Sequence, residues 1–155
     1  MLFANDAHVA LTDGEDEIPE DAEQIMRQSI RCAELTPYSM RFEFPFAYVD
    51  VVLDSAPDIE PMGEKKISFT VRNRRYVLDN KPYNLTMRWW LPDGFTARGK
   101  QTAVLFHGNS HNPCSCTFAY TLTAGETVSA VNRCVLEIVA EGRTVPMYIP
   151  IMLLG

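Results

Sequence analysis

Apolar and polar side chains alternate along most of the chain from residue 40 onward, and the alternation is clearest over residues 85–91. Every second residue there is apolar, as in a strand with one buried face. These apolar residues are Leu85, Met87, Trp89 and Leu91. A Pro-Asp-Gly turn at residues 92–94 ends the segment. We predict the central strand of a β-sandwich, with Trp89 in the core and Trp90 on the opposite face.

Six further segments alternate between turn-forming residues, and each is predicted to be a strand. They are residues 47–54, 65–73, 101–107, 116–124, 130–140 and 145–154. Because no helical pattern separates them, a parallel α/β sheet is excluded and antiparallel strands with Greek-key connections are expected. We predict a mainly β fold, a seven-stranded antiparallel sandwich of the immunoglobulin or fibronectin-III type with a short N-terminal helix.

The last predicted strand contains two prolines, Pro146 and Pro150. Both fall on the face opposite to its apolar side chains. Proline has no backbone N–H to donate to a neighbouring strand, so it is tolerated at the edge of a sheet. We therefore predict that residues 145–154 form an edge strand.

A helical pattern occupies part of the first 39 residues. Apolar residues recur there at intervals of three and four, which predicts a helix over residues 19–34 that ends before Pro37. They are Ala22, Ile25, Met26, Ile30 and Ala33. This helix has too little apolar surface to fold alone, so we expect it to dock on the sandwich or on part of a larger protein. We divide the chain into an acidic, linker-like extension with one helix, residues 1–39, and a β-sandwich domain, residues 40–155.

Charge is unevenly distributed. Residues 1–26 hold eight acidic residues and no Lys or Arg, while the remaining 12 acidic and 14 basic residues leave the rest at +2. This balance excludes nucleic acid as an expected partner, because an acidic segment repels phosphate. No apolar run approaches the roughly 20 residues of a membrane span, and no export signal is recognised. We expect a cytoplasmic protein without a membrane partner, whose cysteines are free thiols, with Cys134 in the core.

Two imidazoles and two thiols lie within residues 107–116. Zinc binds such ligands, so a zinc-stabilised domain is the weakest of three hypotheses. Its ligands would be His107, His111, Cys114 and Cys116. Cys114 and Cys116 are closer together than the pairs of structural zinc sites, and Cys116 begins a strand on the core-facing side. Ser110, between the histidines, lacks the Gly-x-Ser-x-Gly turn of a serine hydrolase. We expect a polar hairpin loop, with no cofactor and no catalytic residues.

Three stretches carry a resemblance to known proteins. They are residues 61–73 (PMGEKKISFTVRN), residues 90–95 (WLPDGF), and Thr117-Phe118 together with Thr121-Leu122-Thr123-Ala124. They resemble the accessory β-sandwich modules of bacterial carbohydrate-active proteins. More narrowly, residues 47–155 resemble the C-terminal immunoglobulin-like sandwich that follows the catalytic domain in long bacterial ADP-ribosylglycohydrolase-like proteins. The resemblance implies a non-catalytic module, because the Thr-Asp-Asp and Gly-Asp-Asp type motifs of that family's hydrolase domain have no match here.

We therefore expect an accessory module, not an enzyme, that contacts an adjacent catalytic domain, another protein or another copy of itself. Trp90 and the loop at residues 107–116 are the expected contacts. The alternative is a carbohydrate-binding module, in which sugar rings stack on exposed aromatic side chains. The candidates at outward or turn positions are Trp90, Tyr83, Phe95 and Tyr148. An outward tryptophan is an equally good anchor for a protein interface.

Overall fold

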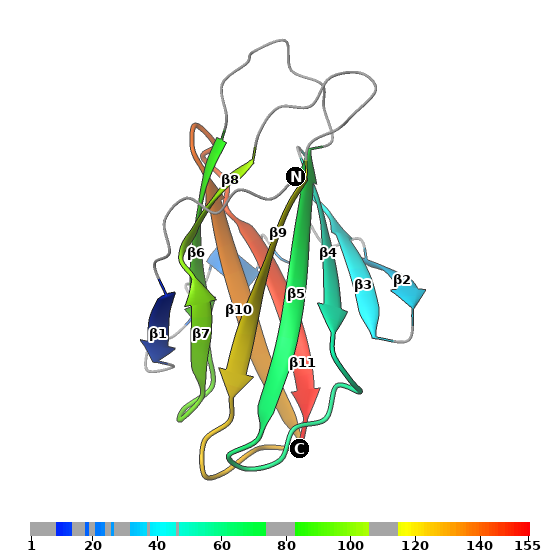
Figure 1. Cartoon of the computed structure of the whole chain (residues 1–155), viewed down its shortest axis with the longest axis vertical. Helices are drawn as coiled ribbons and strands as arrows, with labels where there is room; N and C mark the ends of the chain where they lie inside the picture. The colour runs from blue at the N-terminus through cyan, green and yellow to red at the C-terminus, as the bar shows by residue number, and fades with distance from the viewer. Residues whose placement is uncertain are drawn as a thin grey trace.

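Two antiparallel β-sheets face each other in the computed structural model of the chain (Figure 1). It describes residues 9–13, 18, 21–23, 26, 32–36, 38–45, 47–73, 83–105 and 115–155. These residues form eleven strands. The larger sheet has the order β1 (Val9–Asp13), β7 (Thr96–Lys100), β9 (Ser115–Thr123), β5 (Glu64–Asn73), β4 (Ala47–Leu53), β3 (Ser39–Glu43) and β2 (Cys32–Thr36). The smaller has the order β11 (Met147–Leu154), β10 (Val131–Ala140), β6 (Tyr83–Trp90) and β8 (Thr102–Leu105).

The mainly β, two-sheet antiparallel arrangement confirms the sandwich expected from the sequence. Each of the seven predicted strands has a counterpart in the structure: β4, β5, β6, β8, β9, β10 and β11. Four strands were not predicted, namely β1, β2, β3 and β7. These strands are five residues long and all belong to the larger sheet, and none of them contains a run of apolar residues as long as the one that indicated β8. The expected count of seven strands is therefore too low.

The core between the sheets is built around Trp89. Its side chain is only 3% exposed, and its ring meets two rings of the larger sheet edge to face. The centroid distances are 5.8 Å to Phe69 and 5.3 Å to Tyr120. Phe118 stacks on Phe69 at 5.7 Å. Aromatic pairs of this geometry contribute about 0.5–1.5 kcal/mol each beyond the burial of their area. The prediction that Trp89 fills the core from a central strand is confirmed, because β6 lies between β10 and β8.

β11 lies at the edge of the smaller sheet, as predicted. Of the two prolines, Pro150 lies within the strand and Pro146 immediately precedes it. Pro150 has the same parity as Leu154, whose N–H points away from β10 to Pro57 O, so the missing N–H costs no bond within the sheet. The loop before β5 covers the end of this edge, since Leu154 N donates to Pro57 O (2.7 Å) and Ile59 N donates to Leu154 O (2.8 Å). The edge is thus covered at Leu154 and lacks a donor at Pro150, and both features disfavour pairing with another strand.

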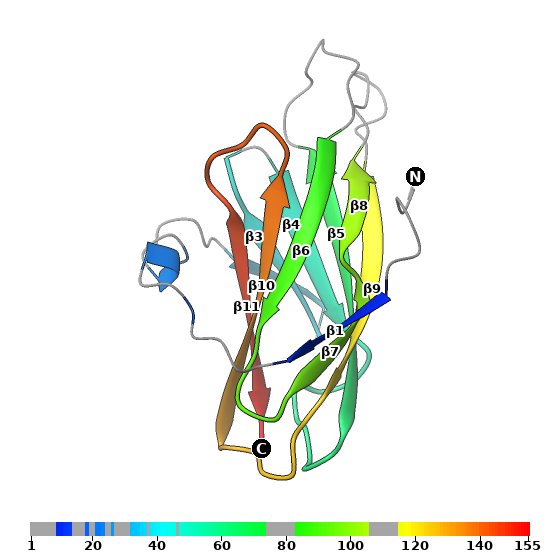
Figure 2. The same ribbon diagram turned by 90° about the vertical axis from the view of Figure 1, so that its left-hand side faces the viewer.

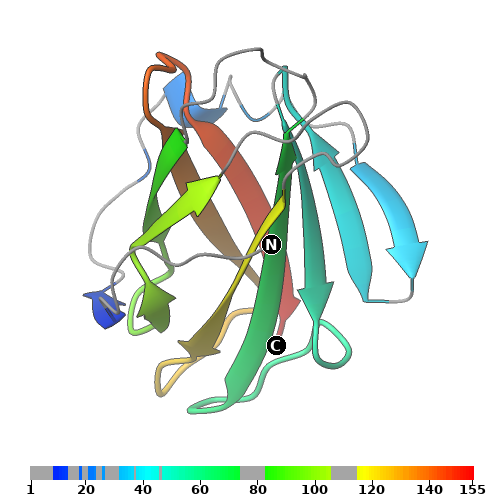
Figure 3. The same ribbon diagram turned by 45° about the horizontal axis from the view of Figure 1, so that its top comes forward.

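The described parts of the N-terminal segment contact both sheets. β1 pairs with β7 and β2 pairs with β3, so the two strands lie at opposite ends of the larger sheet (Figure 3). Between them, residues 21–23 and 26 are helical and lie beside the smaller sheet (Figure 2). We call these residues the helical segment. Part of the region expected to be a linker-like extension, residues 1–39, therefore belongs to the larger sheet.

The prediction of a helix over residues 19–34 is right for the helical segment and wrong at its C-terminal end. Cys32–Thr36 is strand β2, in which Ala33 pairs with Arg41 of β3. Ala33 falls on the helical period of the preceding residues, but the backbone ladder offered by β3 determines its conformation instead. Among the described residues, no helix is long and apolar enough to cross a membrane.

Candidate interaction surface

The outer face of the smaller sheet is the region where the structure brings the predicted contact residue Trp90 together with other side chains. Strand register places Trp90 opposite Val135, and Arg88 opposite Glu137. On the other side of β10, Glu137 is opposite Tyr148. Their neighbours along the strands, such as Trp89 and Leu136, point into the core, so these side chains point outward. We call Arg88, Trp90, Val135, Glu137 and Tyr148 the docking face.

The helical segment covers the docking face. Ala22 and Met26 form a separate buried cluster with Trp90, Val135 and Tyr148, and Ile18 packs against it. Ala22 and Met26 are four residues apart, which places them on the same side of the helical segment. Trp90 is 7% exposed and Tyr148 is 4% exposed. The segment therefore docks on the sandwich through its apolar side, as the sequence predicts.

Glu137 connects the three strands beneath the helical segment. Its carboxylate accepts hydrogen bonds from Trp90 Nε1 (3.1 Å) and from Tyr148 Oη (3.3 Å). Burial, with the charge of Glu137 as the second cause, raises the pKa of Tyr148 to about 12, so its phenol stays a hydrogen-bond donor well into the alkaline range. The Arg88 guanidinium lies 4.1 Å from the Trp90 ring centroid, in cation–π geometry.

Charge also joins the helical segment to the sheet. Arg133 of β10 donates two hydrogen bonds to the Glu23 carboxylate, with Nη1 3.1 Å from Oε2 and Nη2 bonded to Oε1. This two-bond geometry specifies orientation better than a single contact does. Together with Arg88, Arg133 gives the surface around the docking face two cations that suit an acidic segment.

An apolar strip continues from the docking face and is not covered. Met152 is opposite Arg133, and Val131 is opposite Leu154. Val131, Met152 and Leu154 are 57%, 45% and 46% exposed. We call these three residues the exposed strip. On a sheet face where outward positions are normally polar, such side chains indicate a contact surface.

Four aromatic residues were predicted as an exposed binding set, and three of them are buried. Trp90 and Tyr148 lie under the helical segment, so the expectation that they are open to a sugar is wrong in this arrangement. Phe95 is 1% exposed and belongs to the main core, because the turn closed by its N–H and Pro92 O brings it back inward. Tyr83 remains partly exposed. Arg143 lies 5.6 Å from its ring centroid and Nη2 is 3.4 Å from its hydroxyl.

The predicted zinc ligands cannot be compared as a set. His107, His111 and Cys114 lie outside the described residues, and Cys116 is fully buried in the main core. In the part of the chain that the structure describes, no three His, Cys, Asp or Glu side chains are grouped as metal ligands. The zinc hypothesis stays a prediction that the structure weakens, since a core-facing Cys116 is removed from the loop.

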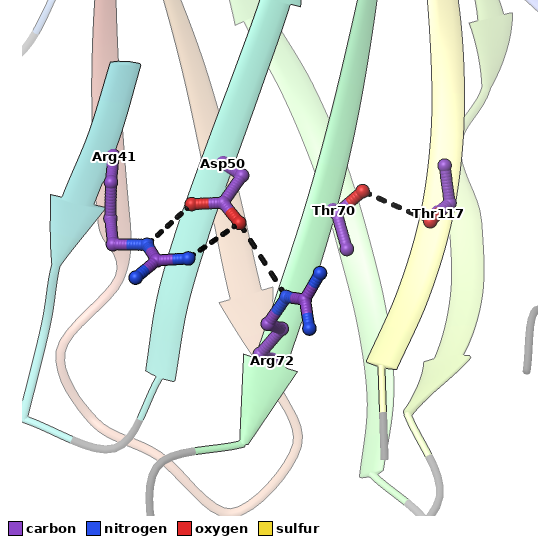
Figure 4. A network of polar contacts seen from close by, with 5 residues as sticks. All are labelled: Arg41, Asp50, Thr70, Arg72 and Thr117. Atoms are coloured by element: carbon purple, nitrogen blue, oxygen red, sulfur yellow. Dashed lines mark hydrogen bonds and ion pairs between the residues drawn. The ribbon is translucent and has the colours of Figure 1, made fainter. Parts of the chain in front are cut away.

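A second polar network crosses the outer face of the larger sheet (Figure 4). Arg41 donates two hydrogen bonds to Asp50, from Nε to Oδ1 (2.7 Å) and from Nη2 to Oδ2 (3.1 Å). Arg72 Nε lies 3.5 Å from Asp50 Oδ2. The hydrogen bond with Asp50 is the first cause of the raised pKa of Arg41. Thr70 and Thr117 hydroxyls are 3.0 Å apart on the next strands. These contacts join neighbouring strands across the sheet.

Sequence reasoning missed Arg88, Arg133, Val135 and Glu137 as parts of the surface. A signal was present, because Trp90 and Val135 are apolar at outward positions of strands whose other faces are also apolar. A strand that is apolar on both faces is expected to be covered on both. The pattern does not say which segment provides the cover.

The fold and this surface define the chain as a two-sheet β-sandwich protein. No protein-family model matches it, and no curated protein matches it significantly. Among solved structures, it is similar to a FixG-related protein from Vibrio parahaemolyticus, with 13% identity and a TM-score of 0.52. The match covers 70% of this chain and 95% of the other. At this identity the likeness concerns the fold alone, and it does not bear on the resemblance to ADP-ribosylglycohydrolase-like or carbohydrate-active proteins.

Proposed function

We propose that the chain is a non-catalytic accessory module that binds an adjoining domain or another protein through the outer face of its smaller sheet. The observation that carries this proposal is the docking face, which already holds a protein segment through Trp90, Val135 and Tyr148. The exposed strip beside it provides further apolar area for a second contact. Interfaces are anchored by such clusters of aromatic side chains with arginines near them.

The proposal includes an immunoglobulin-like type for the sandwich. The proposal is supported by the order β4-β5-β9 in one sheet and β11-β10-β6 in the other, which corresponds to the orders A-B-E and G-F-C of that fold. The strands at the D and C′ positions, β7 and β8, follow each other in the chain in the opposite order to that fold. In this scheme β1, β3 and β2 extend the first sheet at its edges. Such sandwiches commonly serve as binding modules on larger proteins, which is an argument from fold analogy.

An ADP-ribosylglycohydrolase-like or glycan-active enzyme is the proposed associate, because the sequence resembles the module that follows such catalytic domains. In that arrangement the catalytic domain would precede the sandwich in the chain or be a separate polypeptide. A cytoplasmic location stays a prediction of the sequence.

A passive role is supported by how the described carboxylates are used. Asp50 is held between two arginines, and Glu137 accepts bonds from Trp90 and Tyr148. Acids in such fixed pairs organise a surface and are poorly suited to proton transfer. The carbohydrate alternative keeps only Tyr83 as a partly exposed candidate. A sugar platform needs an open ring face, and the Arg143 guanidinium lies beside that ring.

The proposal is tested by photo-cross-linking in the native host. A photoreactive phenylalanine replaces Met152 in one variant and Val52 in the control. Val52 is 46% exposed, like Met152 at 45%, but lies on the larger sheet. We expect one discrete protein cross-linked from position 152 and not from position 52, and binding of that purified protein to the purified chain. No cross-linked protein from either position, or saturable quenching of tryptophan fluorescence by soluble oligosaccharides, would overturn the proposal.

A further inference from the structure

We propose that the docking face and the exposed strip together form a binding site for an acidic amphipathic helix of a partner protein, which takes the place of the chain's own helical segment. This inference rests on the proposed function and adds the chemistry of the partner. Three observations carry it: the occupant that the site holds, the charge around the site, and the length of the site.

The present occupant shows what kind of segment the site accepts. Its described residues 21–23 and 26 are helical, and Ala22 and Met26, four residues apart, lie against Trp90, Val135 and Tyr148, with Ile18 packed beside them. Only residues 14–31 separate β1 from β2, so the helix is short and is marginal in water without the sheet beneath it. A competing helix that buries more apolar area can therefore displace the helical segment from the docking face.

The charge around the site selects an acidic helix. Arg133 binds Glu23 of the occupant, and Asp21 is close enough to contribute to the raised pKa of Tyr148. Arg88 lies over Trp90. A helix with acidic residues next to its apolar side therefore meets complementary charge, whereas a basic helix would be repelled by the two arginines.

The site extends beyond the part that the described residues of the occupant cover. From Glu137 to Val131 it follows β10 for six residue steps, which is about 20 Å at the rise of a strand. The described residues of the occupant pack against Trp90, Val135 and Tyr148, near one end of this stretch. The uncovered part is the exposed strip. It is continuous with the docking face through the pair of Arg133 and Met152, so a longer helix would cover both.

The test uses the full chain and a fluorescein-labelled peptide of residues 15–31 as the probe. The tethered segment competes with the peptide at an effective concentration in the millimolar range. A receptor variant with Ala22→Asp and Met26→Asp weakens that competitor. We expect this variant to bind the peptide at least about ten-fold tighter than the unaltered chain, as measured by fluorescence anisotropy.

Further substitutions in the receptor variant locate the binding. Val135→Asp should abolish binding of the peptide. Met152→Asp places a charge in the exposed strip, which the peptide leaves uncovered, so it should not change the affinity for the peptide but should weaken by about five-fold the binding of the partner protein cross-linked from position 152. Val52→Asp is the matched control and should leave the affinity unchanged. Thermal melts establish that each variant is folded. A folded receptor variant without saturable binding of the peptide would overturn the inference, and so would a partner protein that binds equally well with Met152→Asp and without it.

The two proposals fail in different ways. If the peptide does not bind but a cross-linked partner is found from position 152, the module function stands and the helical chemistry of the partner is wrong. If the peptide binds as expected and no partner is cross-linked, the site is supported and the accessory function is overturned. A peptide with every acidic residue changed to lysine should not bind, and equal binding of this peptide would contradict the proposed selection for acidic helices.

Discussion

Trp90 Nε1 donates a 3.1 Å hydrogen bond to Glu137 Oε2, and this bond links β6 to β10 beneath the helical segment. Tyr148 Oη donates to the other oxygen of the same carboxylate at 3.3 Å, which adds β11. One acidic side chain thus positions the two aromatic rings on which the helical segment rests. Because the segment covers these rings, the hydrogen bonds are shielded from solvent. A donor left without an acceptor there would lower the stability of the fold.

The first prediction concerns this carboxylate. Glu137→Ala leaves Trp90 Nε1 and Tyr148 Oη without their acceptor, so it should lower the free energy of unfolding by about 1–3 kcal/mol. Glu126→Ala, at an exposed position after β9, is the control and should change it little. Urea denaturation measures both. Equal stability of Glu137→Ala and the unaltered chain would mean that the two donors find other acceptors.

The second prediction concerns alkaline pH. Burial raises the pKa of Tyr148 from 10.0 to about 12. Between these values the unfolded chain loses the phenolic proton before the folded chain does, so stability falls as the pH rises through this window. Tyr148→Phe removes this contribution, and its loss of stability between about pH 9 and about pH 11 should be smaller, by up to about 1.4 kcal/mol. Tyr38→Phe, at an exposed position, should follow the unaltered chain.

The third prediction concerns the loop that covers the edge of β11. Lys65 is buried, and its Nζ lies 2.7 Å from both Ser55 Oγ and Ala56 O. The same loop accepts the Leu154 N–H at Pro57 O. Lys65→Met should release the loop and speed hydrogen exchange at the amide of Leu154. Lys66→Met, on the exposed side of β5, is the control. Unchanged exchange at Leu154 would show that the loop is held without Lys65.

The fourth prediction concerns the close approach of β7 to β9. A Cβ at Gly99 would overlap the ring of Tyr120 and lie 2.8 Å from the carbonyl oxygen of Ala119. The ring is fixed by packing against Trp89 and by a hydrogen bond from its hydroxyl to Lys100 O. Gly99→Ala should therefore cost about 1–3 kcal/mol in stability. Arg98→Ala, next to it and exposed, should cost much less in the same thermal melts.

Much of the sandwich could be predicted from the sequence. Trp89 could be placed in the core because a strand alternates its side chains between two faces. β11 could be placed at an edge because proline has no N–H to donate. Both effects act within a few residues. The site was predicted less well. Trp90 was recognised as an outward aromatic, but Glu137 and Arg133 were not recognised as its neighbours, since β10 lies more than 40 residues further along the chain.

The sequence by itself determined which face of each long strand is apolar, and it determined that an apolar helical segment must dock somewhere. Only the tertiary structure decided that Cys32–Thr36 is a strand, that Phe95 is buried, and that the helical segment lies over Trp90 and Tyr148. The physical reason is the range of the interactions. Alternation and turns are local, whereas strand pairing and the cover over an outward side chain depend on segments that only the fold brings together.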